Sequence, residues 1–282
     1  MNEEGPKQEH PAAPEKGASI EVRRQEAIQG IRDQYGILFI TLVPPEVAQQ
    51  FGVKNDQEWF QKALGLSGDS KNLKTIDVVN QGLPDTVEET GIIIGGSPWS
   101  VYEKENEPWM IRLKEFLREM HARGKPMLGV CFGHQLLAST FGGRVEKNPK
   151  GRDFGSLNVD LTDEGVRDPL FEGVPKRFVA SESHRDAVTK IPELKEVAVL
   201  ARNDLDAHQS ISYGKSTRSV QFHPEVTPYT MGKIATARRD TLMEQGFFKD
   251  DADFQRFLGS LKDTPESRSV LHNFVVKFVL QK

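Results

Sequence analysis

The sequence predicts an α/β fold in which a doubly wound, mostly parallel open sheet carries an antiparallel edge and added C-terminal helices. Three observations support this prediction. Short apolar runs alternate with longer segments of helical period through the first half of the chain, as in β–α–β units. The second half contains shorter apolar runs separated by turn residues, which favours antiparallel pairing. Beyond Pro228 the pattern becomes helical again.

Four strands are expected in the first half, each a short and mostly apolar run, at residues 36–43, 73–79, 90–95 and 127–130. Three helices are expected among them, at residues 45–66, 107–123 and 132–141. Parallel strands joined through helices make right-handed crossovers, which cover both faces of the sheet with helices. The first half therefore predicts the doubly wound part of the fold.

Five shorter strands are expected in the second half, at residues 156–161, 177–181, 198–201, 209–213 and 219–222. Three helices should follow them, at residues 229–245, 252–261 and 267–281. The last of these carries a single apolar stripe formed by Val270, Leu271, Phe274, Val275, Phe278 and Val279. Because such a stripe needs an apolar surface to cover it, we expect this helix to dock against the core.

The chain divides by composition into a polar lead and one long domain. Residues 1–19 are rich in Glu, Lys, Pro and Ala, which indicates disorder. Residues 20–34 place apolar side chains among charges and predict an amphipathic helix, which could pack on the core or meet a partner. We therefore expect a polar, partly disordered extension at residues 1–33 and an α/β domain at residues 34–282. The part of this domain from about residue 228 onward is a helical extension.

The composition argues against several classes of function. The 282 residues include 37 basic and 41 acidic ones, mixed along the chain to a net charge of −4, so we expect no nucleic-acid or membrane surface. Apolar runs such as residues 37–43 are too short to span a membrane. One cysteine, without a basic segment leading into an apolar one, predicts a reducing, cytoplasmic location. No motif indicates a cofactor or a metal.

Cys131 lies between an apolar strand-like run and an apolar helix-like segment, with Gly129 and Gly133 two residues to either side. Glycines at these places remove the Cβ atoms that would block a sharp strand-to-helix turn. Such a turn is expected to expose the Cys131 side chain over the end of the sheet, at a helix N-terminus whose dipole favours a thiolate. A lone cysteine is more often a small buried apolar residue, but this setting favours a nucleophile.

A second group of candidate residues follows a predicted strand. His223 and Glu225 are separated by one proline, and residues two apart in an extended segment face the same side. The carboxylate could hold the imidazole in one tautomer, as a base for a thiol nucleophile requires. A solvated surface pair is the ordinary alternative.

The third candidate is a glycine-containing loop that follows the strand predicted at residues 90–95. Gly95, Gly96, Ser97 and Pro98 would form a tight loop at the carboxyl edge of the sheet, where open α/β folds bind ligands. Backbone N–H groups can approach a substrate closely there, as an oxyanion hole requires. An ordinary strand-to-helix turn is the alternative, and a phosphate loop is disfavoured because no Gly-Lys-Ser/Thr follows.

Together these segments resemble the class I (triad) glutamine amidotransferase family, whose fold is flavodoxin-like. Gly129-Val-Cys131-Phe-Gly133-His-Gln135 is similar to its nucleophile elbow, and Phe222-His223-Pro224-Glu225 to its His-Pro-Glu signature. Residues 151–155 and 183–188 are most similar to the amidotransferase domain of GMP synthase. The resemblance covers residues 35–227, with the motifs in the family's order.

The resemblance implies a role for each motif. Cys131 would attack the side-chain amide of glutamine to form a γ-glutamyl thioester, His223 would carry the proton to ammonia, and Glu225 would orient His223. The N–H groups of Phe132 and Gly96 would bind the oxyanion. Gln135 would hold the amino-acid end of the substrate, beside the loop residues Gly95, Ser97 and Pro98.

Residues near these motifs have less definite roles. His184 could be a second imidazole of the site or a group that hydrogen-bonds the substrate, but a structural role near the triad is favoured. Arg152 is expected to form a salt bridge that supports the elbow, and His134 to pack. Trp99 could narrow the pocket or simply pack beside the loop.

Three functions remain open at this point. The residues after the His-Pro-Glu motif have helical period and no phosphate loop, so GMP synthesis by this chain alone is not expected. The first possibility is a glutaminase that releases ammonia for a separate ATP-dependent synthetase. The second is an independent hydrolase of γ-glutamyl peptides, and the third is a non-catalytic regulatory protein with the same fold.

Overall fold

The computed structural model describes residues 21–22, 24–26, 29, 36–67 and 71–281. The N-terminal extension predicted over residues 1–33 and the helix predicted over residues 20–34 therefore lie mostly outside the described residues. Those of them that are described, residues 21–22, 24–26 and 29, are helical.

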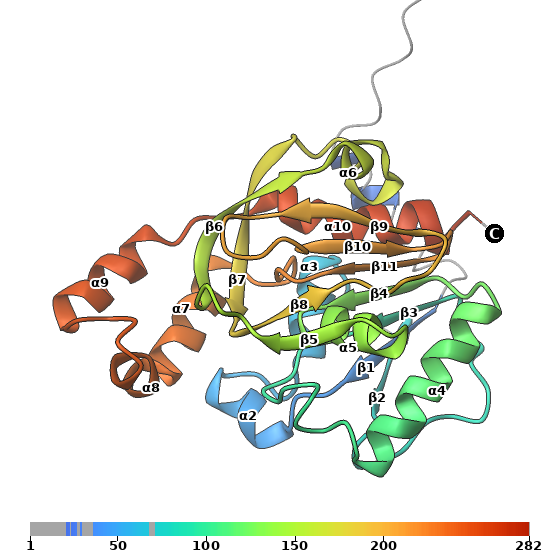
Figure 1. Cartoon of the computed structure of the whole chain (residues 1–282), viewed down its shortest axis with the longest axis horizontal. Helices are drawn as coiled ribbons and strands as arrows, with labels where there is room; N and C mark the ends of the chain where they lie inside the picture. Colours follow the sequence, from blue (N-terminus) through green and yellow to red (C-terminus); the bar gives the residue numbers. More distant parts are fainter. Residues whose placement is uncertain (1–20, 23, 27–28, 30–35, 68–70, 282) are drawn as a thin grey trace, which may run out of the picture.

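One nine-stranded sheet forms the centre of the described chain, in the order β2-β1-β3-β4-β11-β10-β9-β6-β7 (Figure 1). The parallel part consists of β1 (Ile37–Thr41), β2 (Leu73–Asp77), β3 (Gly91–Ile94), β4 (Met127–Val130) and β11 (Thr217–Val220). The antiparallel part consists of β10 (Ser210–Tyr213), β9 (Val197–Arg202), β6 (Asp153–Leu161) and β7 (Arg177–His184). The mostly parallel α/β sheet with an antiparallel edge, predicted from the sequence, is thus confirmed.

Helices cover both faces of this sheet. On one face, α4 (Pro108–Ala122) and α5 (Phe132–Thr140) pack over Leu38, Ile92 and Ile94. On the other, α3 (Gln57–Ala63) and α10 (Pro265–Phe274) pack over the alternate residues of the same strands. The apolar stripe of the last helix packs on the core as predicted. Beyond α10 the chain continues as a π-helix, Val275–Val279.

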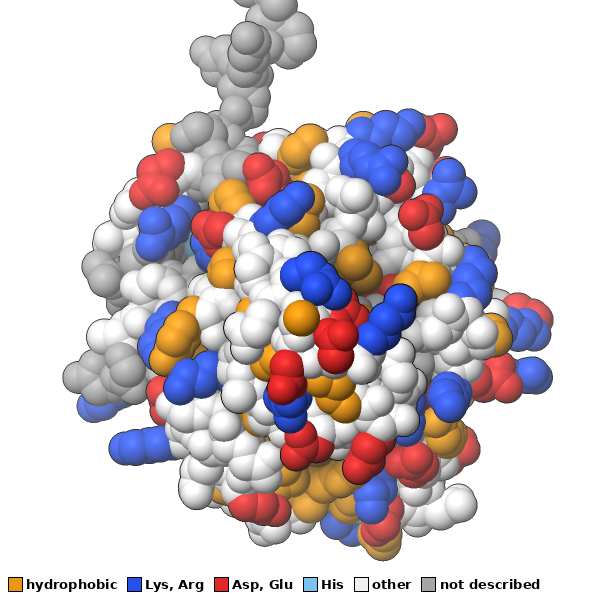
Figure 2. Space-filling model, turned by 90° about the vertical axis from the view of Figure 1, so that its left-hand side faces the viewer, with side chains coloured by type: hydrophobic (Ala, Val, Ile, Leu, Met, Phe, Trp, Pro, Cys, Tyr) orange, Lys and Arg blue, Asp and Glu red, His pale blue; other side chains and the backbone are white. Residues whose placement is uncertain are grey.

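A third apolar cluster lies beyond the end of the sheet. It is formed by α2 (Pro45–Gln50), α7 (Pro228–Ala237), α8 (Arg239–Glu244) and α9 (Asp251–Ser260), which gather around the aromatic residues Phe51, Phe154, Phe248 and Phe257. Figure 1 shows α7, α8 and α9 standing out to the left of the sheet. Figure 2 looks onto this side and shows basic and acidic side chains interspersed over it.

Two of the predicted helices are interrupted. The helix predicted over residues 45–66 is divided into α2 and α3. Gly52 takes a left-handed backbone conformation (φ 78°), which ends α2. The helix predicted over residues 229–245 is divided into α7 and α8 at Arg238, whose backbone leaves the helical region (φ −102°, ψ 7°). This break turns the Arg238 side chain toward the sheet edge described below.

Several short elements were not predicted. They are the two-stranded sheet of β5 (Arg144–Lys147) and β8 (Asp186–Lys190), the helix α6 (Asp163–Arg167) and the 3-10 turn Pro169–Phe171. Each is too short or too polar to show a period, since Val145 is the only buried residue of β5. None of the described helices combines the length and hydrophobicity needed to cross a bilayer.

Candidate active site

The parallel strands bring the three sequence motifs to one edge of the sheet. Strands β3, β4 and β11 are neighbours and run in the same direction, so their carboxyl ends lie together. Gly95 follows β3, Cys131 follows β4, and His223 comes three residues after β11. The fold therefore assembles the candidate site from segments that are almost 130 residues apart, from Gly95 to His223.

Cys131 forms a sharp elbow between β4 and α5. Its backbone has φ 53° and ψ −102°, and it is the one non-glycine residue with a positive φ among the described residues. The turn is tight: a Cβ atom at Gly133 would lie 2.3 Å from the Ile94 carbonyl oxygen, and one at Gly129 would lie 2.4 Å from that of Gly133. A strained backbone of this kind costs about 1–3 kcal/mol and persists only where the surroundings hold it.

The expectation of an exposed cysteine was wrong, because Cys131 is only 6% exposed. Val47 of α2, Ile234 of α7 and the loop after β3 line the same hollow as Cys131. Its side chain instead lines two adjoining hollows, one of about 330 Å³ and one of about 50 Å³. The thiol is thus accessible to a small molecule while its surroundings are mostly protein.

His223 and Glu225 form a close pair beside the elbow. The imidazole Nδ1 lies 2.6 Å from Glu225 Oε1, and both side chains are largely buried, at 12% and 2% exposed. Burial by itself would lower the pKa of His223, but the charges and hydrogen bonds of Glu225 and Cys131 raise it well above the usual value of 6.5. The pair is therefore suited to hold a proton next to the sulfur.

The loop after β3 lies against both of these groups. A Cβ atom at Gly96 would be 3.5 Å from His223 Cε1 and 4.0 Å from Cys131 Cβ. Gly133 N–H donates to the Gly95 carbonyl at 3.1 Å, which fixes the loop to the elbow. The Gly96 N–H has no hydrogen-bond partner within the described part of the chain, and Phe132 occupies the first turn of α5, where N–H groups lack an intrahelical acceptor. Two free donors thus flank the thiol.

A buried carboxyl that the sequence analysis did not identify lies behind this loop. Asp56 accepts a hydrogen bond from Thr41 Oγ1 at 2.6 Å, and its Oδ2 would lie 2.8 Å from a Cβ atom at Gly95. Burial raises the pKa of Asp56 to about 7, and the charge of Glu225 adds to the increase. In the sequence Asp56 resembles any polar residue that precedes a helix. Its burial beside Gly95 could therefore not be predicted from the neighbouring residues.

Gln135 lies on α5 one turn after the elbow and lines the larger hollow. Its Nε2 donates to the Asp186 carbonyl at 3.0 Å and to Gln221 Oε1 at 3.1 Å. Because these two bonds occupy the amide nitrogen, the oxygen Oε1 is the atom that Gln135 can offer to a ligand.

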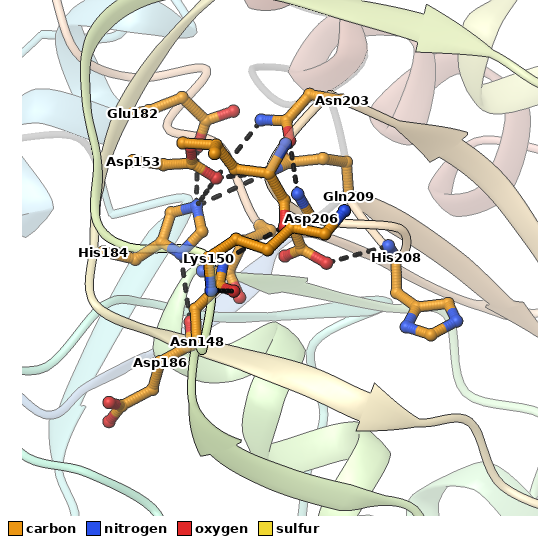
Figure 3. Close-up of polar contacts among 12 residues, drawn as sticks. Asn148, Lys150, Asp153, Glu182, His184, Asp186, Asn203, Asp206, His208 and Gln209 are labelled. Atoms are coloured by element: carbon orange, nitrogen blue, oxygen red, sulfur yellow. Dashed lines mark hydrogen bonds and ion pairs between the residues drawn. The ribbon is translucent and has the colours of Figure 1, made fainter.

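His184 belongs to a buried polar cluster next to the larger hollow (Figure 3). Its Nε2 lies 3.2 Å from Asp153 Oδ2 and 3.1 Å from Glu182 Oε2, while its Nδ1 lies 3.0 Å from the Asp186 carbonyl. Burial opposes the charged ring, yet the hydrogen bonds that its Nε2–H donates to Asp153 and Glu182 raise the pKa of His184 well above 6.5. Burial also raises the pKa of Glu182 to about 7. His184 thus contacts the wall of the hollow, as its position near the motifs suggested, and has no contact with the triad side chains.

The expected salt bridge of Arg152 is not formed. Its Nη2 donates instead to Gln245 Oε1 at 3.1 Å, and it has no carboxylate partner among the described residues. Arg152 still lines the larger hollow, together with Ser97, Pro98 and Arg238. Trp99 was expected either to narrow the pocket or to pack beside the loop. It lines this hollow, and its ring packs on that of Trp109 with ring centroids 5.6 Å apart.

His134 lies on the elbow helix but faces away from the thiol. Its Nδ1 lies 2.8 Å from Ser219 Oγ, and burial lowers the pKa of His134 to about 3. It is therefore a neutral packing residue. No group of three or more His, Cys, Asp or Glu side chains in the described part of the chain is arranged to hold a metal ion.

The fold and the site together define an α/β protein with a strained elbow cysteine that faces a histidine–glutamate pair. The family model for glutamine amidotransferase class-I matches residues 64–239. The chain therefore belongs to the class-I glutamine amidotransferases, and it is an enzyme of that family.

Curated relatives agree with this assignment. The chain is 41% identical over 144 residues to a GMP synthase of Thermosipho melanesiensis, covering 51% of this chain but 25% of the relative. It is 34% identical to a glutamine-hydrolysing GMP synthase subunit of Methanococcus maripaludis, covering 58% and 84%. It is 28% identical to gamma-glutamyl peptidase 5 of Arabidopsis thaliana, covering 67% and 75%. The chain thus matches about a quarter of the full-length GMP synthase.

A solved structure of a glutamine amidotransferase from Thermotoga maritima has the same fold. It superimposes with a TM-score of 0.68 at 20% sequence identity, covering 88% of this chain and 99% of that one. The flavodoxin-like α/β architecture predicted from the sequence is thereby confirmed.

Proposed function

We propose that this chain hydrolyses the γ-amide of glutamine through a Cys131–His223–Glu225 triad and releases ammonia. The observation that supports this most strongly is the position of His223. It is paired with Glu225 at 2.6 Å and lies against the Gly96 loop, which also contacts Cys131. A nucleophile, a proton carrier and an orienting acid are the groups that this reaction needs.

The first half of the proposed reaction forms a thioester. The Cys131 thiolate attacks the carboxamide carbon, and the N–H groups of Phe132 and Gly96 bind the oxygen that becomes negative. As the carbon–nitrogen bond breaks, the His223 imidazolium donates its proton to the departing nitrogen. Ammonia leaves, and a γ-glutamyl thioester remains on the sulfur.

The second half returns the enzyme to its starting state. His223, now neutral, accepts a proton from water, and the resulting hydroxide attacks the thioester carbon. The same two N–H groups bind the second oxyanion. When the carbon–sulfur bond breaks, the Cys131 thiolate and glutamate are released, and His223 is again an imidazolium.

The sizes of the two hollows support glutamine as the substrate. Gln135 and the arginines line the hollow of about 330 Å³, which has room for a glutamyl group. His223 and Glu225 line the other one, which holds only about 50 Å³ among apolar walls such as Val47 and Ile234. The amine would depart on this narrower side, next to His223.

The acceptor of the ammonia is proposed to be a separate ATP-dependent synthetase. The similarity to the GMP synthase subunit of Methanococcus maripaludis supports a divided arrangement of this kind. A reducing, cytoplasmic location is part of the proposal, because the reaction needs the Cys131 thiol in its reduced form. Glutaminase turnover that rises when ATP-dependent amidating enzymes from the same cells are added would support the partner, and turnover that stays constant would contradict it.

A γ-glutamyl peptide hydrolase is the second candidate, supported by the similarity to the Arabidopsis peptidase. A single assay separates the two. Purified protein is given glutamine and a panel of γ-glutamyl dipeptides, and glutamate release is measured for each. We expect a kcat/KM at least about tenfold higher for glutamine. A higher value for any dipeptide would favour the hydrolase instead.

The third possibility, that this chain is a non-catalytic protein, is tested with the same preparation. A glutamine-like chloroketone should alkylate Cys131, because its carbonyl occupies the place of the carboxamide beside the nucleophile. Mass spectrometry of the peptide that contains Cys131 reports the adduct. Absence of both the adduct and turnover would contradict the proposed function.

A further inference from the structure

Two arginines that line the same hollow as Cys131 form no ion pair with any described residue. Among the described residues, six arginines are buried or partly buried, and four of these, Arg185, Arg218, Arg239 and Arg268, form ion pairs with carboxylates. The remaining two are Arg152 and Arg238, for which no ion pair is formed within the described chain. The other described arginines are exposed to solvent.

Within the described part of the chain, both guanidinium groups donate hydrogen bonds to neutral side chains. Arg238 donates to Ser183 Oγ at 3.1 Å and lies 5.8 Å from the Phe51 ring centroid. Arg152 donates to Gln245 Oε1 at 3.1 Å. Burial lowers the pKa of both arginines. A partly buried charge without a counterion is unfavourable, so an anion that entered this space would be stabilised there.

Arg152 and Arg238 also line the same space. They come from distant parts of the chain, the segment before β6 and the break between α7 and α8, and both border the hollow of about 330 Å³ that contains Cys131. Arg238 is close enough to the sulfur for its charge to interact with that of Cys131. The two cations therefore face the volume in which a substrate of Cys131 would lie.

The acidic residue in this hollow, Asp186, forms no ion pair with either arginine within the described chain, although its charge acts on Arg152. The Asp186 carboxylate accepts hydrogen bonds from Ser100 and Tyr102 and forms an ion pair with Arg185, Nε to Oδ1 at 3.1 Å. Its acceptor positions are directed toward these three groups. The positive charge of Arg238 is thus left for a ligand, and that of Arg152 is compensated only in part, by the nearby charge of Asp186.

We propose that Arg238 and Arg152 form a binding subsite for the α-carboxylate of the γ-glutamyl substrate. Guanidinium groups bind carboxylates with paired, charge-assisted hydrogen bonds. The Oε1 atom of Gln135, in the same hollow, can accept a hydrogen bond from the α-ammonium group. The inference rests on the proposed function for its substrate, but the carboxylate can be tested without turnover.

The experiment compares glutamine with glutaminamide, in which a carboxamide replaces the α-carboxylate. Ammonia release from each is measured for the parent protein and for Arg238→Gln, Arg238→Lys and Arg152→Gln. Arg239→Gln is the matched control, because Arg239 is the next residue and already pairs with Asp240 and Asp251. Thermal unfolding of each variant confirms that it is folded.

The parent should prefer glutamine, and Arg238→Gln should lower kcat/KM for glutamine by about 10- to 100-fold, the value of a charged hydrogen bond. For glutaminamide the same variant should change kcat/KM by less than about threefold. Arg238→Lys should recover part of the loss, and Arg239→Gln should leave the preference unchanged. Equal losses on both substrates, or no loss, would overturn the subsite.

Titration calorimetry with L-glutamate separates this inference from the proposed function. Glutamate carries the α-carboxylate and needs no catalysis to bind. If the parent binds glutamate and Arg238→Gln does not, the subsite stands even where glutamine is not hydrolysed. If glutamine is hydrolysed with no preference over glutaminamide, the proposed function stands and the subsite is wrong. Failure of the parent to bind glutamate would also contradict the subsite.

Discussion

Gln135 and His184 bind the same carbonyl oxygen, that of Asp186. Gln135 Nε2 and His184 Nδ1 each lie 3.0 Å from it. Gln135 is on the elbow helix, whereas His184 is anchored on its other side by Asp153 and Glu182 (Figure 3). The turn between β7 and β8, which forms one wall of the larger hollow, is therefore fixed from the elbow and from the buried cluster at once.

Replacing His184 with Asn should weaken substrate binding more than chemistry. The Asp186 carbonyl loses one of its donors, so KM for glutamine should rise by about tenfold while kcat changes less. Steady-state kinetics give both values. His121→Asn is the control, because His121 bonds Thr217 away from the site. An equal fall in kcat with an unchanged KM would contradict this positioning role.

The same variant should be less stable, by an amount that depends on pH. Asp153 and Glu182 lose their cationic partner, which costs about 3 kcal/mol. The pKa of His184 is raised in the folded protein, so its contribution is complete below the unfolded pKa of about 6.5 and is lost as the pH rises through the folded value. Urea unfolding should therefore show a parent–variant difference that is smaller in alkaline buffer than at pH 6.

Glu225→Gln should reduce activity less than His223→Ala. The carboxylate only orients and stabilises the imidazolium, whereas the imidazole carries the proton. Because Glu225 helps to raise the pKa of His223, its loss should move the alkaline limb of the kcat/KM profile to lower pH. Profiles recorded from about pH 6 to about pH 10 test this shift. A limb that stays in place would show that Glu225 does not act on His223.

Asp56→Asn should remove part of the pH dependence of stability. The pKa of Asp56 is raised from 3.8 to about 7 in the folded protein. A raised carboxyl pKa means that stability is complete below about 4 and declines as the pH rises through about 7. Asn keeps the acceptor for Thr41 but never ionises. The urea midpoint should be lower at pH 8 than at pH 5 for both proteins, because Glu182, whose pKa is also about 7, is retained in the variant. The decrease should be smaller for the variant than for the parent, and equal decreases would contradict the assignment.

Gly133→Ala should destabilise the elbow. The new Cβ atom would lie 2.3 Å from the Ile94 carbonyl oxygen, so the backbone must shift, which costs about 3 kcal/mol. Gly259→Ala is the matched control, because nothing lies within 4 Å of its Cβ position. Alanine in this helix should be neutral or stabilising by up to about 1 kcal/mol. Similar unfolding free energies for the two variants would disprove the steric account.

The sequence predicted the parts of the fold that have a strong local pattern. Strands β1, β3 and β4 are almost wholly apolar, and α4 and α5 have clear helical period, so their places were found within a few residues. The helix predicted at residues 45–66 failed because one glycine interrupted an otherwise regular pattern. Strands β5 and β8 are short and half polar, and only their pairing with each other defines them.

The candidate site shows the same division. Cys131, His223 and the Gly95–Gly96 loop could be named as candidates because each directly follows a predicted strand, and the structure brings the ends of these strands together. Arg238 and Asp56 were missed, because their proximity to Cys131 and Gly95 is created by tertiary packing. The expected exposure of Cys131 was wrong for the same reason, since residues far from it in the sequence, such as Val47 and Ile234, line the hollow that contains it.

The most direct test of the account is the rate of ammonia release from glutamine by the parent protein and by Cys131→Ala, measured side by side. The variant removes the sulfur and should remain folded, which circular dichroism checks. We expect the parent to turn over and the variant to lose at least about a thousandfold in kcat/KM, since Cys131 is the one cysteine of the sequence and alanine has no nucleophilic atom. A variant that retains activity within about tenfold of the parent would contradict Cys131 as the nucleophile and, with it, the proposed reaction.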